Sequence, residues 1–132
     1  MRLLLIALAC SFALACVPKR DLTVQQIPKL TKLEDVMDVQ STVMDPQFKK
    51  IGAASYSDAD FAAFADAGAR LQASAIKIKD FSKGAGFDAL AMQLHDQAKQ
   101  LADAAGAKNA VAASQALASM KSTCKQCHSK FR

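Results

Sequence analysis

Cys124, Cys127 and His128, close to the end of the 132-residue sequence, form a Cys-x-x-Cys-His motif. This order is the attachment pattern of c-type haem. Each thiol adds to one haem vinyl group to form a thioether, and the two-residue gap matches the distance between the vinyls. A His directly after the second thiol can then bind the iron as its proximal ligand. The motif therefore predicts one covalently bound haem c per chain.

Two other uses of paired cysteines fit this sequence less well. A thioredoxin-type redox pair follows a strand and begins a helix, whereas here a long helical pattern leads into the motif. A zinc site needs four ligands, and the only other histidine is His95. Because His95 stands next to Asp96 and Gln97, we expect it on the surface rather than on a metal.

The N-terminal segment has the pattern of a secretory signal peptide. Arg2 precedes an apolar stretch over residues 3–14, and the small residues Ala13 and Ala15 stand just before Cys16. The stretch is shorter than the about 20 residues that cross a bilayer. Residues 1–15 are therefore predicted to direct export and to be removed. Haem is attached to cytochromes c outside the cytoplasm, so export and the haem motif agree.

Cys16 stands at the position of the lipidated first residue of a bacterial lipoprotein. Residues 12–16 resemble a lipobox, with Ala13 where Leu is more usual, although ordinary signal peptidase could also cleave after Ala15. We favour lipidation of Cys16, which would anchor the protein to the periplasmic side of a membrane without spanning it. Residues 16–30, with Pro18 and Pro28, are predicted to be a tether.

Charge and composition exclude nucleic-acid binding. After removal of residues 1–15, 16 basic and 12 acidic side chains remain, and the sequence contains no Trp. A modest positive surface could help docking with an acidic redox partner, but solvated helix faces explain the charge equally well. The length suits one domain, which we place at residues 31–132.

From residue 31 onward the sequence predicts only helices, because Ala is abundant and period-two alternation is missing. We expect the first helix to begin at a capping box of Thr31 and Glu34 and to be interrupted at Asp45–Pro46. A second helix should start near Ser57. The third should span about residues 87–105 and the fourth about 109–131.

Each predicted helix has one apolar row, and in the second and fourth helices the row alternates steps of three and four. In the second and third helices the rows are Phe61, Phe64, Gly68, Leu71, Ala75 and Ile78, then Leu90, Ala91, Leu94, Ala98 and Leu101. The row of the fourth helix runs through the haem motif and contains Ala113, Leu117, Met120, Cys124, Cys127 and Phe131. Both thiols should therefore face the core of an all-α, antiparallel four-helix bundle, near its C-terminal end.

The sequence resembles the class II cytochromes c, which comprise cytochrome c′ and its low-spin relatives. The resemblance covers the whole helical region and is strongest in residues 94–132, which end in Cys-x-x-Cys-His-x-x-Phe-Arg. Residues 46–52 and 71–75 also look like parts of the family's first two helices. The resemblance implies thioethers at Cys124 and Cys127 and a proximal ligand at His128. It also implies that Arg132 lies beside the proximal imidazole.

The sequence offers Met37, Met44 or an open position for the sixth iron ligand. In six-coordinate relatives a first-helix Met supplies a sulfur, whereas cytochrome c′ leaves this position open. Met37 and Met44, seven residues apart, fall on the inner stripe, with Gln40 between them. We favour Met37 because it precedes the break at Asp45–Pro46, where Met44 would be less rigidly held. The other Met would fill the core.

Two functions follow from these alternatives. A haem with His128 and Met37 as ligands would be a one-electron carrier for periplasmic or membrane redox proteins. A five-coordinate iron would bind nitric oxide or carbon monoxide, for sensing or scavenging. No enzymatic activity is expected, because the sequence offers no distal His–Arg pair for peroxidase chemistry. The sequence does not identify the partner, the reduction potential, or whether the protein forms a homodimer through its first two helices.

Replacing Cys16 with Ser should release the protein from membranes into the soluble periplasmic fraction, because most of the apolar area that anchors it is lost with the acyl chains. Cell fractionation and immunoblotting measure the change. Cys10→Ser, the matched control within the signal peptide, should leave the protein on the membrane. Wild-type protein in the soluble fraction would contradict the lipoprotein hypothesis.

Overall fold

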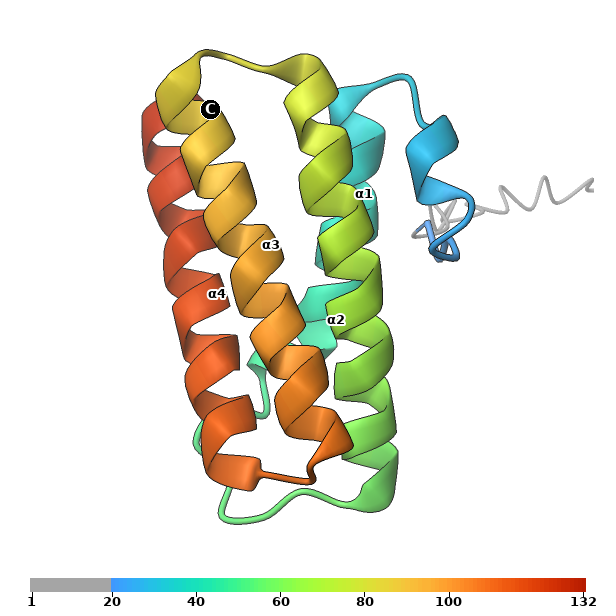
Figure 1. Cartoon of the computed structure of the whole chain (residues 1–132), viewed down its shortest axis with the longest axis vertical. Coiled ribbons are helices and arrows are strands. Elements are labelled where there is room, and N and C mark those ends of the chain that lie inside the picture. Colours follow the sequence, from blue (N-terminus) through green and yellow to red (C-terminus); the bar gives the residue numbers. More distant parts are fainter. Residues whose placement is uncertain (1–19) are drawn as a thin grey trace, which may run out of the picture.

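A computed structural model describes residues 20–132, which form four long helices and two short 3-10 helices. The long helices are α1 (Leu33–Phe48), α2 (Asp58–Ile78), α3 (Ala85–Gly106) and α4 (Ala110–Phe131). Figure 1 shows them side by side in alternating directions. Among these residues there is no strand. The predicted all-α, antiparallel four-helix bundle is thus confirmed.

The predicted signal peptide and Cys16 lie outside the described residues. Within residues 20–132, no helix combines the length and the apolar character of a membrane span.

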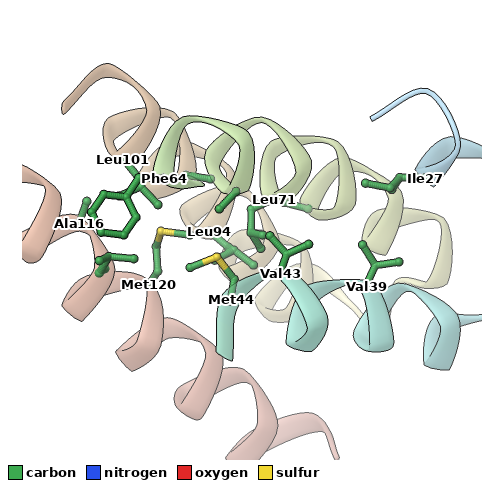
Figure 2. Packing of buried hydrophobic residues seen from close by; sticks show 14 of the residues in the cluster. Ile27, Val39, Val43, Met44, Phe64, Leu71, Leu94, Leu101, Ala116 and Met120 are labelled. Carbon is green, nitrogen blue, oxygen red and sulfur yellow. The ribbon is translucent and has the colours of Figure 1, made fainter. Parts of the chain in front are cut away.

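The core consists of the apolar rows that the sequence predicts. Every member of the rows of α2 and α3 is buried, and so are Ala113, Leu117 and Met120 of α4. Figure 2 shows Met44 of α1 and Met120 of α4 pointing into this cluster beside Leu94. Helices with a single apolar stripe can bury it only against one another, and this requirement produces the bundle.

Two of the four helices begin at side chains that cap free backbone amides. At α2, Ser57 accepts a hydrogen bond from the amide of Asp60, whose carboxylate accepts one from the amide of Ser57 at 2.9 Å. Lys50 Nζ lies 2.8 Å from the same carboxylate, and these donors lower the pKa of Asp60 to about 2. At α4, Asn109 accepts from the amide of Ala112 at 3.0 Å.

Two expectations for α1 are wrong. The helix begins at Leu33, after Lys32, and its start has no side-chain cap. Thr31 therefore lies one residue too early to form the expected box with Glu34. The helix also continues through Pro46 to Phe48 instead of breaking. Because Pro46 lies in the last turn and has a helix-compatible φ, it removes a single backbone hydrogen bond.

The link between α2 and α3 contains a short 3-10 helix and a glycine with positive φ. After Ile78 the chain tightens into η2 (Lys79–Phe81), and Gly84, with a φ of 107°, precedes α3. Gly86 lies in the first turn of α3. An L side chain rarely adopts the φ of Gly84, so a glycine suits this entry into α3.

The second half of the predicted tether packs on the bundle. Residues 27–29 form η1 (Ile27–Lys29), the side chain of Ile27 is fully buried, and Leu30 joins the core. Arg20 pairs with Asp35 of α1 at 3.0 Å. A free linker would make no such contacts, so the folded unit includes residues before position 31.

Helices α2 and α3 approach each other closely at Gly68. A Cβ at this position would lie 2.7 Å from the carbonyl oxygen of Ala98 and 2.9 Å from Cβ of Ala102. Both neighbours belong to α3, and the carbonyl is backbone that cannot move aside alone. The glycine is therefore needed for space.

Gly68→Ala should destabilise the protein by about 1–3 kcal/mol, because the two helices must separate to admit the methyl group. Urea unfolding followed by circular dichroism measures the change. Gly106→Ala is the matched control, since a Cβ there meets nothing within 4 Å. It should be neutral or stabilising by up to about 1 kcal/mol, as Ala favours helix over Gly. Equal stability of the two variants would contradict the close approach.

Candidate functional site

A cavity of about 600 Å³ opens at the end of the bundle that contains the C-terminus. Its volume lies within the about 300–1,000 Å³ typical of small-molecule and cofactor pockets. The wall is mainly apolar, and α1, α3 and α4 each contribute to it. Its apolar side chains include Leu33, Met37, Ile78, Phe87, Leu90, Ala91, Leu94 and Phe131.

Helix α4 brings Cys124 and Cys127 to this cavity. Residues three apart lie on neighbouring positions of one helix face, so both thiols are turned to the same space. Both are half-buried and neither is in a disulfide. Burial raises the pKa of Cys124 to about 11, and burial also raises that of Cys127.

These pKa shifts argue against a redox pair. A thiol attacks as thiolate, and reactive pairs have a pKa below the ordinary value of a free cysteine. At neutral pH both thiols of this site are protonated instead. The pair is therefore suited to being held against a bound group inside the bundle rather than to exchanging disulfides with partners in solution.

His128 and Arg132 complete the α4 side of the site. Both are exposed and line the cavity, and the amide of Arg132 donates a 3.3 Å hydrogen bond to the carbonyl oxygen of His128. This bond continues the helical turn beyond Phe131, so the two side chains are one turn apart. The imidazole of His128 is available at the cavity as a nitrogen ligand.

From α1, Met37 and Gln40 line the cavity, whereas Met44 is buried in the core and does not line it. The amide nitrogen of Gln40 donates to Ser74 Oγ at 3.0 Å, and Ser74 Oγ donates to the carbonyl oxygen of Leu71 at 3.1 Å. This buried chain of hydrogen bonds ties α1 to α2 one turn away from Met37.

Sequence reasoning did not assign Phe87 and Lys83 to the wall. Phe87 packs edge-on against Phe131, with ring centroids 5.4 Å apart, and Lys83 Nζ donates to the carbonyl oxygen of Phe131 at 2.7 Å. Phe87 could have been found, since the start of α3 and the end of α4 meet in an antiparallel bundle. The position of Lys83 depends on the turn at Gly84, and no sequence signal reveals it.

His95 lies on α3 outside the cavity, with Nδ1 3.0 Å from Asp96 Oδ1. In the part of the chain that the structure describes, no three His, Cys, Asp or Glu side chains gather as a metal site would require.

The residues around the cavity fit a covalently held haem. Two thiols on one helix face can hold the edge of a flat group, and the imidazole of His128 is an axial ligand that haem iron takes. The mainly apolar wall suits a macrocycle.

Comparison with known proteins supports this assignment. A family model described as Cytochrome C' matches residues 25–132. Neither the curated proteins nor the solved structures gave a match.

Replacing both Cys124 and Cys127 with Ala should release all haem into acid–acetone, because no thioether can form. Each single variant should retain at most one thioether, and its reduced pyridine haemochrome band should shift because one vinyl group stays conjugated with the ring. Ser129→Ala, on the same turn, should behave as wild type. Single variants with the wild-type band would contradict attachment through these thiols.

Proposed function

Because this chain belongs to the cytochrome c′ family, we propose that it carries single electrons with His128 and Met37 as axial ligands of its haem. Proteins of this family bind haem c covalently, so haem c with its iron, one per chain, is the cofactor. When bound, haem supplies an iron that changes reversibly between the ferric and ferrous states. The protein contributes the ligands, their orientation and the surrounding apolar wall.

The position of Met37 is the observation that carries this proposal. Its side chain lines the same cavity as His128 and both thiols, but it comes from α1 rather than α4. A methionine sulfur paired with a histidine nitrogen raises the reduction potential of haem iron. Two ligands on separate, well-packed helices also change little in position when one electron is gained or lost, as a carrier requires.

The alternative is a five-coordinate iron that binds nitric oxide or carbon monoxide. The apolar wall favours it, because Leu33, Leu90 and Leu94 line the cavity and would surround an open position. Met37 decides between the two functions. With its sulfur on the iron the site excludes such gases, and with its sulfur turned away the cavity admits them.

The proposed carrier works outside the cytoplasm, as the signal-peptide pattern of residues 1–15 and the typical location of the family indicate. Lipidation at Cys16 would keep it at the periplasmic face of a membrane. Its partners would be periplasmic or membrane redox proteins that exchange electrons with it, and the chain itself would catalyse no reaction.

Met37→Ala should open the sixth position, so that the reduced protein binds carbon monoxide and its reduction potential falls. Optical spectra with and without the gas, together with a redox titration, measure both effects. Reduced wild type should not respond to the gas.

Met44→Ala is the matched control. Its side chain is only 2% exposed, so its truncation should cost about 2–5 kcal/mol of stability and leave the spectrum unchanged. If the outcomes are exchanged, the ligand is Met44. If reduced wild type already binds carbon monoxide, the gas-binding alternative replaces the carrier.

A further inference from the structure

Helix α4 carries exposed basic residues that form no ion pair within the described part of the chain. No acidic residue occurs from Ala104 to Arg132, whereas Lys121, Lys125, Lys130 and Arg132 are all exposed. The ion pairs within residues 20–132 use basic residues elsewhere, namely Arg20, Lys50, Arg70, Lys77, His95, Lys99 and Lys108.

Of the four exposed basic residues of α4, Lys121, Lys125 and Arg132 lie on the same helix face as His128. At 3.6 residues per turn, positions 121, 125, 128 and 132 fall within an arc of about 60° on the helix surface. Lys121, Lys125 and Arg132 are hereafter called the basic row. Lys130 lies about 140° away from Lys125, on another face of the same helix.

Helix stability does not explain the basic row. Cations favour the C-terminal end of a helix through its dipole, but the effect is confined to about the last turn. Lys121 and Lys125 lie farther from the end than that. Lys121 Nζ does lie 5.9 Å from the ring centroid of Phe48, at the seam between α1 and α4. An exposed contact of this kind contributes little, and Lys125 has no partner at all among the described residues.

The other side of the cavity mouth has the opposite charge. Glu34 and Asp38 of α1 are exposed, line the cavity and take part in no ion pair of the described residues. Asp45 is near enough to help raise the pKa of Cys124. Acidic side chains of α1 therefore line the mouth, whereas on α4 Arg132 lines it and Lys121 and Lys125 lie outside it. Such an arrangement orients a charged partner as well as attracting it.

We propose that the basic row is the docking surface for an acidic redox protein, which exchanges an electron with the haem at the His128 side. This proposal rests on the carrier function. The acidic face of the partner would be attracted by the basic row of α4 and repelled by Glu34 and Asp38 of α1. The partner's redox centre would therefore lie at the end of the bundle that contains the cavity.

The test is stopped-flow electron transfer to plant plastocyanin, an acidic one-copper protein used as the probe. One electron passes from ferrous haem iron to Cu(II), giving ferric iron and Cu(I). With wild type the second-order rate constant should fall steeply as NaCl is raised from low concentration. At low salt Lys125→Glu and Lys121→Glu should each lower it about tenfold, because steering is lost.

Lys130→Glu is the matched control. It changes the net charge equally on the same helix but on another face, and it should alter the rate less than about twofold. The optical spectrum and reduction potential of every variant should equal those of wild type. If Lys125→Glu and Lys130→Glu slow the reaction equally, net charge alone acts and the proposed surface is wrong. If Lys125→Glu changes the spectrum or the potential, Lys125 serves the haem instead.

Two further outcomes would assign the basic row to another occupant and overturn the proposal. One is binding of the Cys16→Ser protein to phosphatidylglycerol vesicles that Lys125→Glu abolishes and Lys130→Glu does not. The other is a dimer, seen by sedimentation at low salt, that Lys125→Glu abolishes and Lys130→Glu does not. Carbon monoxide binding by reduced wild type would refute the carrier function separately, and the plastocyanin rates would still report on the surface.

Discussion

The bundle must keep one of its ends free of its own side chains, and the rest of the structure depends on that constraint. The side chains around this cavity of about 600 Å³ can therefore pack against a bound group rather than against one another. The remainder of the core is correspondingly dense. Phe64, Leu71, Leu101 and Leu117 are fully buried, Gly68 lets α2 touch the backbone of α3, and Ile27 closes the outer side of α2. A haem held by thioethers stays attached when the chain unfolds, so it would stabilise the fold through the apolar contacts that it makes with this wall.

The chemistry of the site depends on the point at which the inner row of α4 passes from the packed core to the cavity. Up to Met120 the inner row of α4 packs against other helices, and from Cys124 onward the same row faces the cavity. The thiols are thereby buried enough to stay protonated, and His128, slightly off the row, remains reachable from solvent. A bound group would be enclosed on the side of the thiols and approached on the side of the imidazole, where the basic residues of α4 also lie.

Most of the fold was predictable, because it depends on periodic apolar rows and on local caps such as Ser57 and Asn109, which are properties of neighbouring residues. The errors occurred where contacts between residues far apart in the sequence determine the local structure. Burial of Ile27 and Leu30 turns part of an apparent tether into structure, and α1 begins only after Lys32. Pro46 interrupts nothing because it lies in a last turn, and this depends on where the helix ends. The thiols and His128 were identifiable from spacing alone, whereas Lys83 reaches the site only through a turn that Gly84 makes.

The level of each methionine along the bundle follows from the antiparallel arrangement of α1 and α4. Helices α1 and α4 run in opposite directions, so a step toward the start of one corresponds to a step toward the end of the other. Met44 and Met120 both point into the same core cluster. Seven residues from them, about 10.5 Å along each axis, lie Met37 on α1 and Cys127 on α4. An antiparallel pair that aligns Met44 with Met120 must also align Met37 with the haem motif. The same heptad spacing that puts both first-helix methionines on one face thus assigns one to the core and the other to the cavity.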